Sequence, residues 1–409
     1  MKVDTMRRID YLAGIPLCWL ATWLVRLLDL FSARGADRPI RRALFVELSE
    51  MGSAVLVDPA MRKLARETGA ELYFVIFKKN APSLRLLGTV PEANVYTIRE
   101  DSLWHLAWDT LRFFWWTRRT GIDTVYDLEL FSRYSALLTG LSGARRRIGF
   151  HAYHNEGLYR GAMLTHRVWY NPHLHISRVF VALVNAGLAE KPELPYSKTL
   201  VTDDEVQLAR AAVEPAQQEA VRERIRALYP EYDPAAHRLV LINPNASDLL
   251  PQRRWMPDRY VALMQRILEQ YDDTLVLITG APAEQAQAES LREQVGHPRC
   301  VNFAGQVGFL ELVPLYSIAA LMVSNDSGPG HFAAVTDLPT FVIFGPETPA
   351  LYGPLGNTTP IYAGLACSPC VSAANHRKTA CTDNVCLKVI DVGRVFDTIR
   401  PVLSKGAAD

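Results

Sequence analysis

Short apolar runs alternate with segments of helical spacing along most of the chain. In the first half, strands are predicted over residues 43–48, 72–77, 94–97, 123–129 and 146–150. Between the first two of these runs, residues 55–68 carry apolar positions at helical spacing. Strands that alternate with helices favour a parallel sheet with helices on both faces.

The same alternation restarts at residue 238 and is more regular there. The predicted strands are 238–244, 274–280, 300–305, 321–326 and 340–345, and the predicted helices are 259–271, 284–295, 309–319 and 331–337. Two such halves predict an α/β fold of two Rossmann-like, doubly wound domains that face a cleft, with ligands at the carboxyl ends of the strands.

The predicted organisation has five segments. They are an N-terminal membrane-associated helical segment (1–38), a first Rossmann-like domain (39–195), a linker with a helix (196–236), a second Rossmann-like domain (237–390) and a C-terminal helix with a tail (391–409).

The N-terminal segment is unusually apolar. Residues 11–25 carry no charge, and Arg26 and Asp29 then interrupt the run. About 20 apolar residues are needed to span a bilayer, so this run is short. Basic residues flank it on both sides, at Lys2, Arg7, Arg8, Arg34, Arg38, Arg41 and Arg42. We predict a helix that lies in the membrane or dips into it from the cytoplasmic side. An ordinary buried helix and, more weakly, a removed signal peptide are the alternatives.

A second candidate for membrane contact is the segment 103–119. It holds four of the eight tryptophans together with three arginines. A basic, aromatic helix of this kind suits a membrane interface, and a helix packed on the first sheet is the alternative.

Composition narrows the function classes. The chain has 409 residues, of which 49% are hydrophobic and 21% charged, which is ordinary for a globular protein with a large core. The formal net charge is +1, so no whole-chain basic excess indicates nucleic-acid binding.

The strongest motif follows the predicted strand 321–326. Its residues Asp326, Ser327, Gly328, Pro329, Gly330 and His331 open a predicted helix. We expect Ser327 to cap this helix and the two glycines to let the backbone approach a ligand. Backbone amides and the helix dipole would then bind a diphosphate, and Asp326 would accept hydrogen bonds from sugar hydroxyls. A simple capped helix start is the alternative.

Polar loops after the neighbouring strands add further donor-binding candidates. Asn245 and Ser247 follow the strand 238–244, and Arg253 comes shortly after them as a cation for phosphate. Glu284 begins the helix after strand 274–280 and could hold a ribose diol or only favour the helix dipole. Val307, between strand 300–305 and helix 309–319, completes the set.

The same stretch permits a different interpretation. Residues 328–333 (GPGHFA) match a dinucleotide-binding pattern, and Glu347 lies 19 residues after Gly328, where a ribose-binding acid would stand. A dinucleotide-dependent oxidoreductase is therefore an alternative, although this pattern normally follows the first strand of its domain.

These motifs together resemble glycosyltransferase family 9, the ADP-heptose:lipopolysaccharide heptosyltransferases. The resemblance rests on N-A-S, R-x-W, G-A-P-x-E, N-D-S-G-P-G-H-F-A-A and V-I-F-G-P-E-T-P in that order, and it covers roughly residues 41–400. It implies a GT-B fold, an ADP-sugar donor in the second domain and a glycolipid or saccharide acceptor in the first. It also implies inverting, metal-independent transfer in cell-envelope glycan synthesis, at the cytoplasmic face of the bacterial inner membrane.

Carried over to this chain, the resemblance gives Arg253 the place of a lysine that contacts the diphosphate, and Glu284 that of the ribose acid. In the first domain the family's aspartate, its suspected base, is replaced by Ser53, which follows the matching Gly52. Serine cannot act as a carboxylate base. Glu50 or Glu47 would then take over; otherwise the chain is an inactive sugar-nucleotide-binding scaffold.

A basic stretch that begins within the strand 146–150 and continues after it is expected to border the acceptor. Its candidates are Arg147, His151, His154 and Arg160, and a solvated basic edge is the alternative for each. Gly52 of the first loop is a further predicted acceptor-binding residue.

Four cysteines gather late in the chain, at Cys367, Cys370, Cys381 and Cys386. Four thiolates could close a structural zinc site, with reduced thiols or local disulfides as the alternatives. No catalytic role for a metal is expected.

Overall fold

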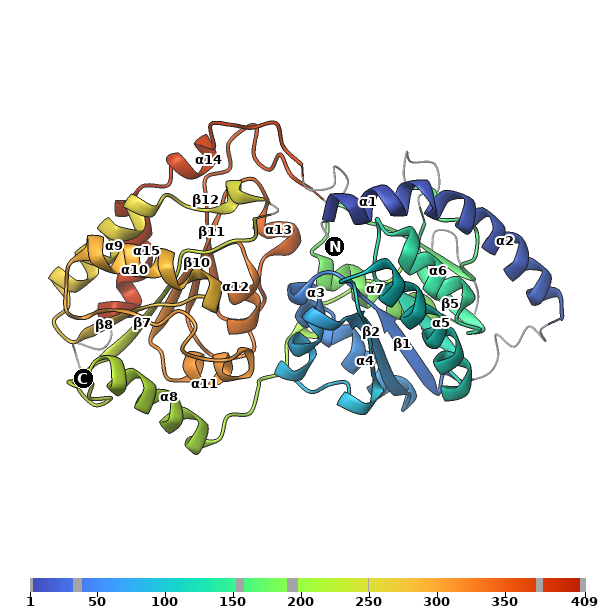
Figure 1. Cartoon of the computed structure of the whole chain (residues 1–409), viewed down its shortest axis with the longest axis horizontal. Helices are drawn as coiled ribbons and strands as arrows, with labels where there is room; N and C mark the ends of the chain where they lie inside the picture. Colours follow the sequence, from blue (N-terminus) through green and yellow to red (C-terminus); the bar gives the residue numbers. More distant parts are fainter. Residues whose placement is uncertain are drawn as a thin grey trace. The chain divides into compact units, whose positions relative to one another are not determined.

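The computed structural model describes residues 3–31, 39–151, 158–189, 198–248, 250–372 and 378–404. It divides into two compact units, Met1–Gln207 and Leu208–Asp409 (Figure 1). Each unit is described below by itself.

The first unit is built on a parallel sheet that has six strands in the described chain. They are β1 (Arg42–Val46), β2 (Glu71–Phe77), β3 (Val95–Ile98), β4 (Thr124–Asp127), β5 (Arg146–His151) and β6 (His166–Trp169). Their spatial order is β3-β2-β1-β4-β5-β6. Strands β1 to β3 extend the sheet to one side and β4 to β6 extend it to the other, so the strand order reverses between β1 and β4. Val46 of β1 lies opposite Asp127 of β4. The loops after these two strands therefore meet at the carboxyl edge, where such sheets bind ligands.

Helices cover both faces of this sheet. The helical elements are α1 (Val3–Leu12), α2 (Gly14–Phe31), α3 (Met51–Leu56), α4 (Asp58–Thr68), η1 (Lys78–Leu86), η2 (Glu92–Asn94), α5 (Leu103–Thr120), α6 (Arg133–Leu141), α7 (Ile176–Leu188) and η3 (Asp204–Val206). Phe113 of α5 and Leu138 of α6 pack on one face against Leu44 and Val46. On the other face, α7 passes so close to Tyr126 that a Cβ on Gly187 would lie 2.4 Å from its hydroxyl.

The second unit repeats this plan, with six parallel strands among its described residues. They are β7 (Arg238–Asn243), β8 (Thr274–Ile278), β9 (Cys300–Asn302), β10 (Leu321–Asn325), β11 (Thr340–Phe344) and β12 (Thr358–Tyr362), in the order β12-β11-β10-β7-β8-β9. The strand order reverses between β7 and β10, where Ile242 lies opposite Val323.

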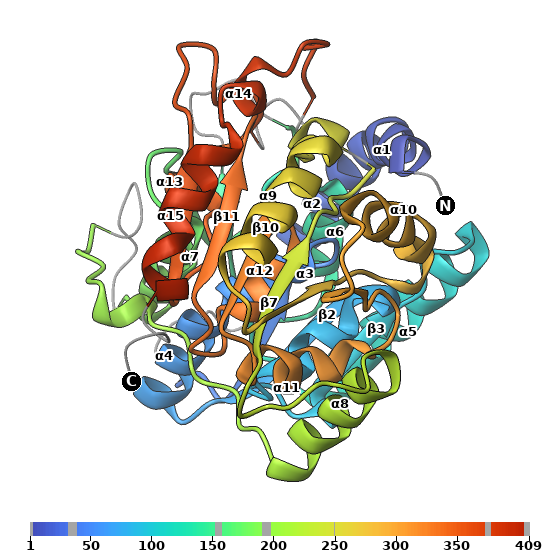
Figure 2. The ribbon, with the colours of Figure 1, turned by 90° about the vertical axis from the view of Figure 1, so that its left-hand side faces the viewer.

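The helical elements of the second unit are α8 (Pro215–Leu228), η4 (Pro251–Arg253), α9 (Pro257–Gln270), η5 (Pro282–Glu284), α10 (Gln285–Val295), η6 (Phe309–Glu311), α11 (Leu312–Ser317), α12 (Gly328–Ala333), α13 (Pro349–Tyr352), α14 (Val385–Lys388) and α15 (Val392–Ser404). Figure 2 shows α9 and α15 side by side. Phe396 and Ile399 of α15 belong to the same apolar core as Trp255 and Tyr260.

The predicted fold class is confirmed, and the pattern missed two strands. Both are edge strands, because β6 pairs with β5 and β12 pairs with β11 at the ends of the two sheets. Unlike the other two edge strands, β3 and β9, these two carry mixed residues instead of an apolar run, and β12 contains Pro360, which edge strands tolerate.

The predicted N-terminal helix forms and continues to Phe31. Cys18, Ala21 and Val25 of α2 pack against Ala136 of α6 and against Met163. Within the described residues, α2 is the one helix long and apolar enough to cross a membrane by length and composition, a property that core helices and signal sequences share.

Candidate functional site

A single amide side chain fixes the loops at the carboxyl edge of the second sheet. Asn325, the last residue of β10, is fully buried. Its Oδ1 accepts hydrogen bonds from the Trp255 amide at 3.0 Å and from the Tyr260 hydroxyl at 2.9 Å, and its Nδ2 donates to the Pro244 carbonyl at 2.7 Å. The loop after β7 and the segment that carries Arg253 are thereby held beside the end of β10. The sequence marked Asn325 only as a strand end.

Arg253 lies between two buried carboxylates. Its Nε is 3.3 Å from Asp326 Oδ2, and its Nη2 is 2.6 Å from Glu347 Oε2. The structure thus brings together the predicted cation and the predicted sugar-binding acid. Glu347, to which sequence reasoning gave a role only in the oxidoreductase alternative and which otherwise appeared only as a letter of the family motif V-I-F-G-P-E-T-P, is a third member of this group. It binds the guanidinium instead of standing free for a ribose. Arginine is the side chain whose planar fork of donors recognises phosphate oxygens, and here Nε and Nη2 of that fork face the two carboxylates.

The glycine-rich helix start differs from the prediction. Ser327 occupies the N-cap of α12 without a side-chain capping bond, and its hydroxyl donates to the Asn325 carbonyl at 3.2 Å instead. Pro329 stands in the first turn as predicted. A Cβ on Gly330 would lie 3.0 Å from Pro354 Cγ and one on Gly328 would lie 2.9 Å from the Phe332 ring. Close packing therefore already favours both glycines, at Gly330 against Pro354 and at Gly328 against a side chain of α12 itself.

Two of the other donor candidates meet at the ends of β7 and β8. The Asn245 Nδ2 donates to the Thr279 carbonyl at 3.2 Å, and Glu284 Oε2 accepts from the Ala281 amide at 2.6 Å. A Cβ on Gly280 would lie 2.8 Å from Asn245 Nδ2 and 2.9 Å from Glu284 Oε2, so both side chains surround this glycine. One carboxylate oxygen of Glu284 caps its own turn, which is the alternative role that the sequence left open.

The remaining donor candidates differ in exposure. Ser247 is exposed in the loop after β7, Val307 is half-buried before η6, and His331 is buried in α12.

In the first unit, three glutamates gather at the carboxyl edge between β1 and β4. Glu47 directly follows β1 and is buried. Glu129, two residues after β4, accepts hydrogen bonds from the Leu48 amide at 3.0 Å and from the Ser49 hydroxyl at 3.2 Å. Glu50 precedes α3, and its Oε2 accepts a hydrogen bond from the Ser53 hydroxyl at 3.1 Å. Ser53 therefore orients one of the two predicted replacement bases.

Sequence reasoning missed Glu129. The signal for it was present, because Glu129 ends the run 123–129, and an acid at the carboxyl end of a strand beside β1 faces the same edge as Glu47.

Burial and mutual repulsion favour the protonated form of the buried glutamates in this cluster. Burial raises the pKa of Glu47 well above its usual range, and the nearby charges of Glu129 and Glu50 raise it further. Burial also raises the pKa of Glu129. Closely spaced carboxylates titrate as a group, so a proton is shared among them at a higher pH than an isolated glutamate would hold it.

The raised pKa of Glu47 has a consequence for stability. Between its ordinary pKa of about 4.3 in the unfolded chain and its higher folded value, the folded state binds more protons than the unfolded state. The free energy of unfolding therefore falls as pH rises through that interval, by up to about 1.4 kcal/mol per pH unit. We expect Glu47→Gln to remove this loss and to raise Tm at pH 8 but not at pH 4, measured by thermal unfolding. If the difference in Tm between pH 4 and pH 8 is the same for Glu47→Gln as for wild type, the raised pKa of Glu47 is contradicted.

The predicted acceptor residues separate into two groups. Arg160 lies at the carboxyl edge, where its guanidinium pairs with the fully buried Asp127 and its Nε donates to the Ser132 carbonyl at 2.9 Å. Gly52 stands in the first turn of α3 at the same edge. His151 ends β5 there, and burial together with Arg167 and Arg160 lowers its pKa. His154 lies outside the described residues.

Arg147 corrects the prediction. It stands near the amino end of β5, and its buried guanidinium binds Asp29 Oδ2 of α2 at 2.7 Å and the carbonyls of Met163 and Ala144, each at 2.7 Å. Its position and these partners show that Arg147 connects α2 to the sheet and does not lie at the edge where an acceptor would bind.

None of the four late cysteines forms a disulfide within the described residues. Cys381 Sγ accepts from the Asn384 amide at 3.3 Å, and Cys370 Sγ lies 3.4 Å from Thr379 Oγ1. Across the described ranges, which leave out residues 373–377 between these cysteines, no three His, Cys, Asp or Glu side chains are arranged to hold a metal ion. Structural zinc stays a prediction.

The chain is similar to known proteins in both sequence and fold. Residues 115–380 match the family described as glycosyltransferase family 9 (heptosyltransferase). Lipooligosaccharide heptosyltransferase 2 of Haemophilus influenzae is 27% identical over 152 residues, which are 36% of this chain and 42% of that protein. Lipopolysaccharide heptosyltransferase 2 of Salmonella typhimurium is 31% identical over 110 residues, 26% of this chain and 31% of that protein. The matched regions thus span less than half the length of these relatives.

Solved structures extend the likeness of fold to nearly the whole chain. The ADP-heptose lps heptosyltransferase II of E. coli aligns with a TM-score of 0.67 at 18% identity, over 90% of this chain and 100% of that one. A glycosyltransferase family 9 structure from Veillonella parvula aligns with a TM-score of 0.68 at 15% identity, over 91% and 100%. Because the family match also covers more than half of the sequence, the chain belongs to glycosyltransferase family 9.

Proposed function

We propose that the chain transfers a sugar, a heptose in the first place, from an ADP-linked donor to a membrane-linked saccharide or lipid. The reaction inverts the anomeric centre, needs no catalytic metal and takes place at the cytoplasmic face of the bacterial inner membrane. Family membership supports sugar transfer and sets aside the oxidoreductase alternative. The relatives' names, which are heptosyltransferases of lipopolysaccharide or lipooligosaccharide, support the donor and the acceptor.

The observation that carries the donor half is the position of Arg253. Its guanidinium lies at the switch point of the second sheet beside Asp326. In this proposal Arg253 stabilises the negative charge that grows on the departing diphosphate, as a fixed cation can do without reorganisation. Asp326 accepts hydrogen bonds from the sugar, Asn245 and Glu284 bind the nucleoside, and Ser327, His331, Ser247 and Val307 line the donor.

The acceptor half rests on the glutamates of the first unit. We assign Glu50 as the general base, because it is half-buried while Glu47 is buried, and because Ser53 orients its carboxylate. Glu50 takes the proton of the acceptor hydroxyl as that oxygen bonds to C1 of the sugar. The bond between C1 and the diphosphate oxygen breaks, and its electron pair leaves with the diphosphate. One displacement of this kind inverts the anomeric centre.

The proposal is tested with a panel of nucleotide sugars and a delipidated saccharide acceptor. Wild type is expected to turn over the ADP-heptose donor and to give the inverted product, which the anomeric coupling in NMR identifies. Asp326→Ala is expected to weaken the donor's Kd at least tenfold, measured by calorimetry.

A second candidate, an inactive sugar-nucleotide-binding scaffold, is favoured by the loss of the family aspartate at Ser53. It requires tight donor binding with no turnover of any donor, so that result for wild type would contradict the transferase and support the scaffold. Absence of both binding and turnover across the panel would contradict both candidates.

A further inference from the structure

Exposed apolar side chains are concentrated on three helices of the first unit. Of the 24 large hydrophobic side chains that are exposed in the described part of the chain, 16 lie on α1, α2 and α5. Five of the eight tryptophans are among them, namely Trp19, Trp23, Trp104, Trp108 and Trp115. Soluble surfaces rarely keep large apolar patches unless the patch binds a partner.

Four of the five exposed large apolar side chains of α5 follow a single line. Trp104, Trp108, Leu111 and Trp115 are spaced by four, three and four residues, which places them on one side of the helix. Trp116 faces the other way and packs against Tyr73 and Tyr96, with ring centroids 5.8 and 5.0 Å apart. The two predicted roles of this segment are thus compatible, because one face packs on the sheet and the other is exposed.

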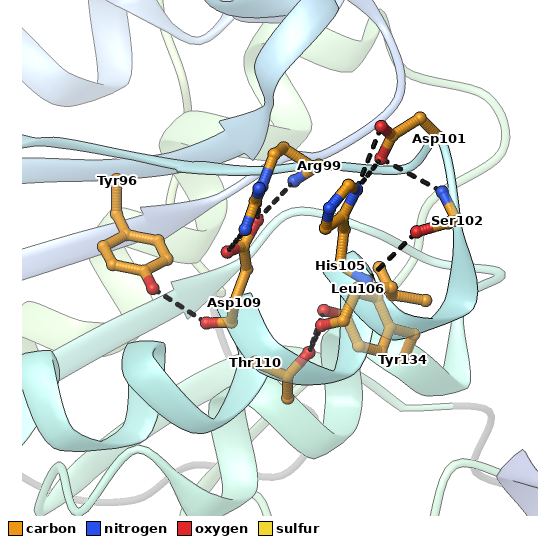
Figure 3. Close-up of polar contacts among 9 residues, drawn as sticks. All are labelled: Tyr96, Arg99, Asp101, Ser102, His105, Leu106, Asp109, Thr110 and Tyr134. Carbon is orange, nitrogen blue, oxygen red and sulfur yellow. Dashed lines mark hydrogen bonds and ion pairs between the residues drawn. The ribbon is translucent and has the colours of Figure 1, made fainter.

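Polar contacts fix the rotation of α5 (Figure 3). The buried Asp109 accepts hydrogen bonds from Arg99 Nε at 2.8 Å and from Arg99 Nη2 at 2.7 Å, and its carbonyl accepts one from the Tyr96 hydroxyl at 2.7 Å. Thr110 Oγ1 lies 2.6 Å from the Tyr134 hydroxyl of α6. The line of tryptophans is therefore held outward by contacts on the opposite face.

The helix α2 is tied along its length to the body of the unit. Shortly before α2, Asp10 Oδ2 of α1 is 3.2 Å from Arg133 Nη1, and near the end of α2, Asp29 Oδ2 is 2.7 Å from Arg147 Nη2. Both guanidinium groups are buried. If α2 crossed a bilayer, it would have to separate from the rest of the unit, and the buried Arg147 would lose its ion pair with Asp29. The 18 residues of α2 also measure only about 27 Å, slightly less than a hydrocarbon core.

The three helices lie around α6 in one region of the unit (Figure 1). The start of α6 contacts both neighbours, because the Tyr134 amide donates to Asp10 Oδ1 at 3.0 Å while its hydroxyl meets Thr110 of α5. We call the exposed side chains of α1, α2 and α5 the tryptophan face.

The charges of this face favour an anionic partner. The carboxylates of Asp10, Asp29 and Asp109 turn inward to arginines of the unit. The exposed charged side chains on these helices include Arg7, Arg8, Arg26, Arg112, Arg118 and Arg119. The guanidinium carbons of Arg26 and Arg119 stand 5.3 and 5.0 Å from the ring centroids of Trp23 and Trp115. Tryptophan rings beside arginines are typical of the headgroup region of membranes.

We propose that the tryptophan face binds the surface of an anionic bilayer, with α2 lying in the interface and not crossing it. The inference rests on the proposed function only for the membrane-linked acceptor. Such a face would hold the first unit against the surface from which that acceptor projects.

Vesicle flotation of the full chain tests the binding. We expect wild type to float with phosphatidylglycerol/phosphatidylethanolamine vesicles, and at least tenfold less with phosphatidylcholine vesicles or in 0.5 M salt. The triple variant Trp104→Ser/Trp108→Ser/Trp115→Ser should lose at least tenfold in partition coefficient. Trp169→Ser, at an exposed tryptophan of β6, should bind like wild type. Binding of the triple variant equal to wild type would overturn the proposal, as would a concentration-dependent oligomer in light scattering that the triple variant abolishes.

The orientation of α2 is tested by labelling. Arg8→Cys and Arg41→Cys place a thiol on either side of the helix, and a membrane-impermeant maleimide is added to protein bound on preformed vesicles, with peptides quantified by mass spectrometry. We expect both thiols to react without detergent, the one at position 8 more slowly because Arg8 belongs to the tryptophan face. Complete protection of the thiol at position 8 until detergent is added, while the thiol at position 41 reacts, would show that α2 crosses the bilayer.

Transfer to a delipidated acceptor separates this inference from the proposed function. The triple variant should retain the turnover of wild type on that acceptor and an unchanged Tm. If the transferase proposal fails, both proteins are inactive while vesicle binding persists. If the bilayer proposal fails, turnover persists while the triple variant still floats like wild type.

Discussion

Arg253→Ala is expected to lower kcat by about 10²- to 10³-fold, because it removes a preset cation from the leaving diphosphate. The same change leaves Asp326 and Glu347 buried without their shared counter-charge, so it should also reduce the free energy of unfolding by about 3 kcal/mol. Steady-state kinetics and chemical unfolding measure the two effects separately.

Two variants control this prediction. Arg253→Lys keeps the charge and loses the fork, and we expect it to recover most of the stability and only part of kcat. Arg254→Ala alters the neighbouring arginine, which binds the Ala246 carbonyl and the surface carboxylate of Asp248. It should leave kcat within about twofold. A kcat for Arg253→Ala equal to that of Arg254→Ala would remove Arg253 from the proposed mechanism.

Glu50→Gln should reduce kcat by about 10²- to 10⁴-fold while the donor's Kd stays unchanged, because the amide cannot accept the acceptor's proton. Stopped assays with ADP-heptose measure kcat, and calorimetry measures Kd. Glu100→Gln alters another buried carboxylate of the same unit, one paired with Lys79 at 3.2 Å, and should leave kcat unaffected. Unchanged turnover in Glu50→Gln would reject Glu50 as the base.

The pH profile gives a second readout for this group. A general base acts when it is deprotonated, so kcat should fall on the acid side. Its neighbours Glu47 and Glu129, whose pKa values burial raises, add their charges to the site as they ionise, so we expect that limb to follow the group rather than Glu50 alone. Glu129→Gln removes one of those charges and should shift the acid limb of kcat to lower pH without removing activity. If the acid limb of kcat lies at the same pH in Glu129→Gln as in wild type, Glu129 is not coupled to the base.

The sequence predicted the strands of both sheet interiors because buried parallel strands are continuous apolar runs. It also found the edge strands β3 and β9, and it missed the edge strands β6 and β12, whose residues are mixed. It assigned Arg253 and Asp326 to one site because both come after central strands and both belong to motifs that resemble those of a known family. The pairing of Arg253 with Glu347 depends on side-chain geometry between segments 94 residues apart in the chain, which no local pattern encodes.

The misassigned residues have a related cause. Arg147 is one of three consecutive arginines, and composition alone does not distinguish an arginine that meets Asp29 from one that meets solvent. Ser327 and the glycines around it have residue types that suit both anion binding and tight packing. The contacts of Gly330 with Pro354 and Val342 come from a segment the motif does not include.

The contiguity of the second unit has a practical consequence. Every strand of its sheet and the terminal helix α15 fall after Leu208, without a return to the first unit. A shortened gene that starts at this residue therefore encodes the complete sheet but none of α1, α2 and α5. Such a fragment would permit nucleotide titrations by isotope-edited spectroscopy without lipid or detergent.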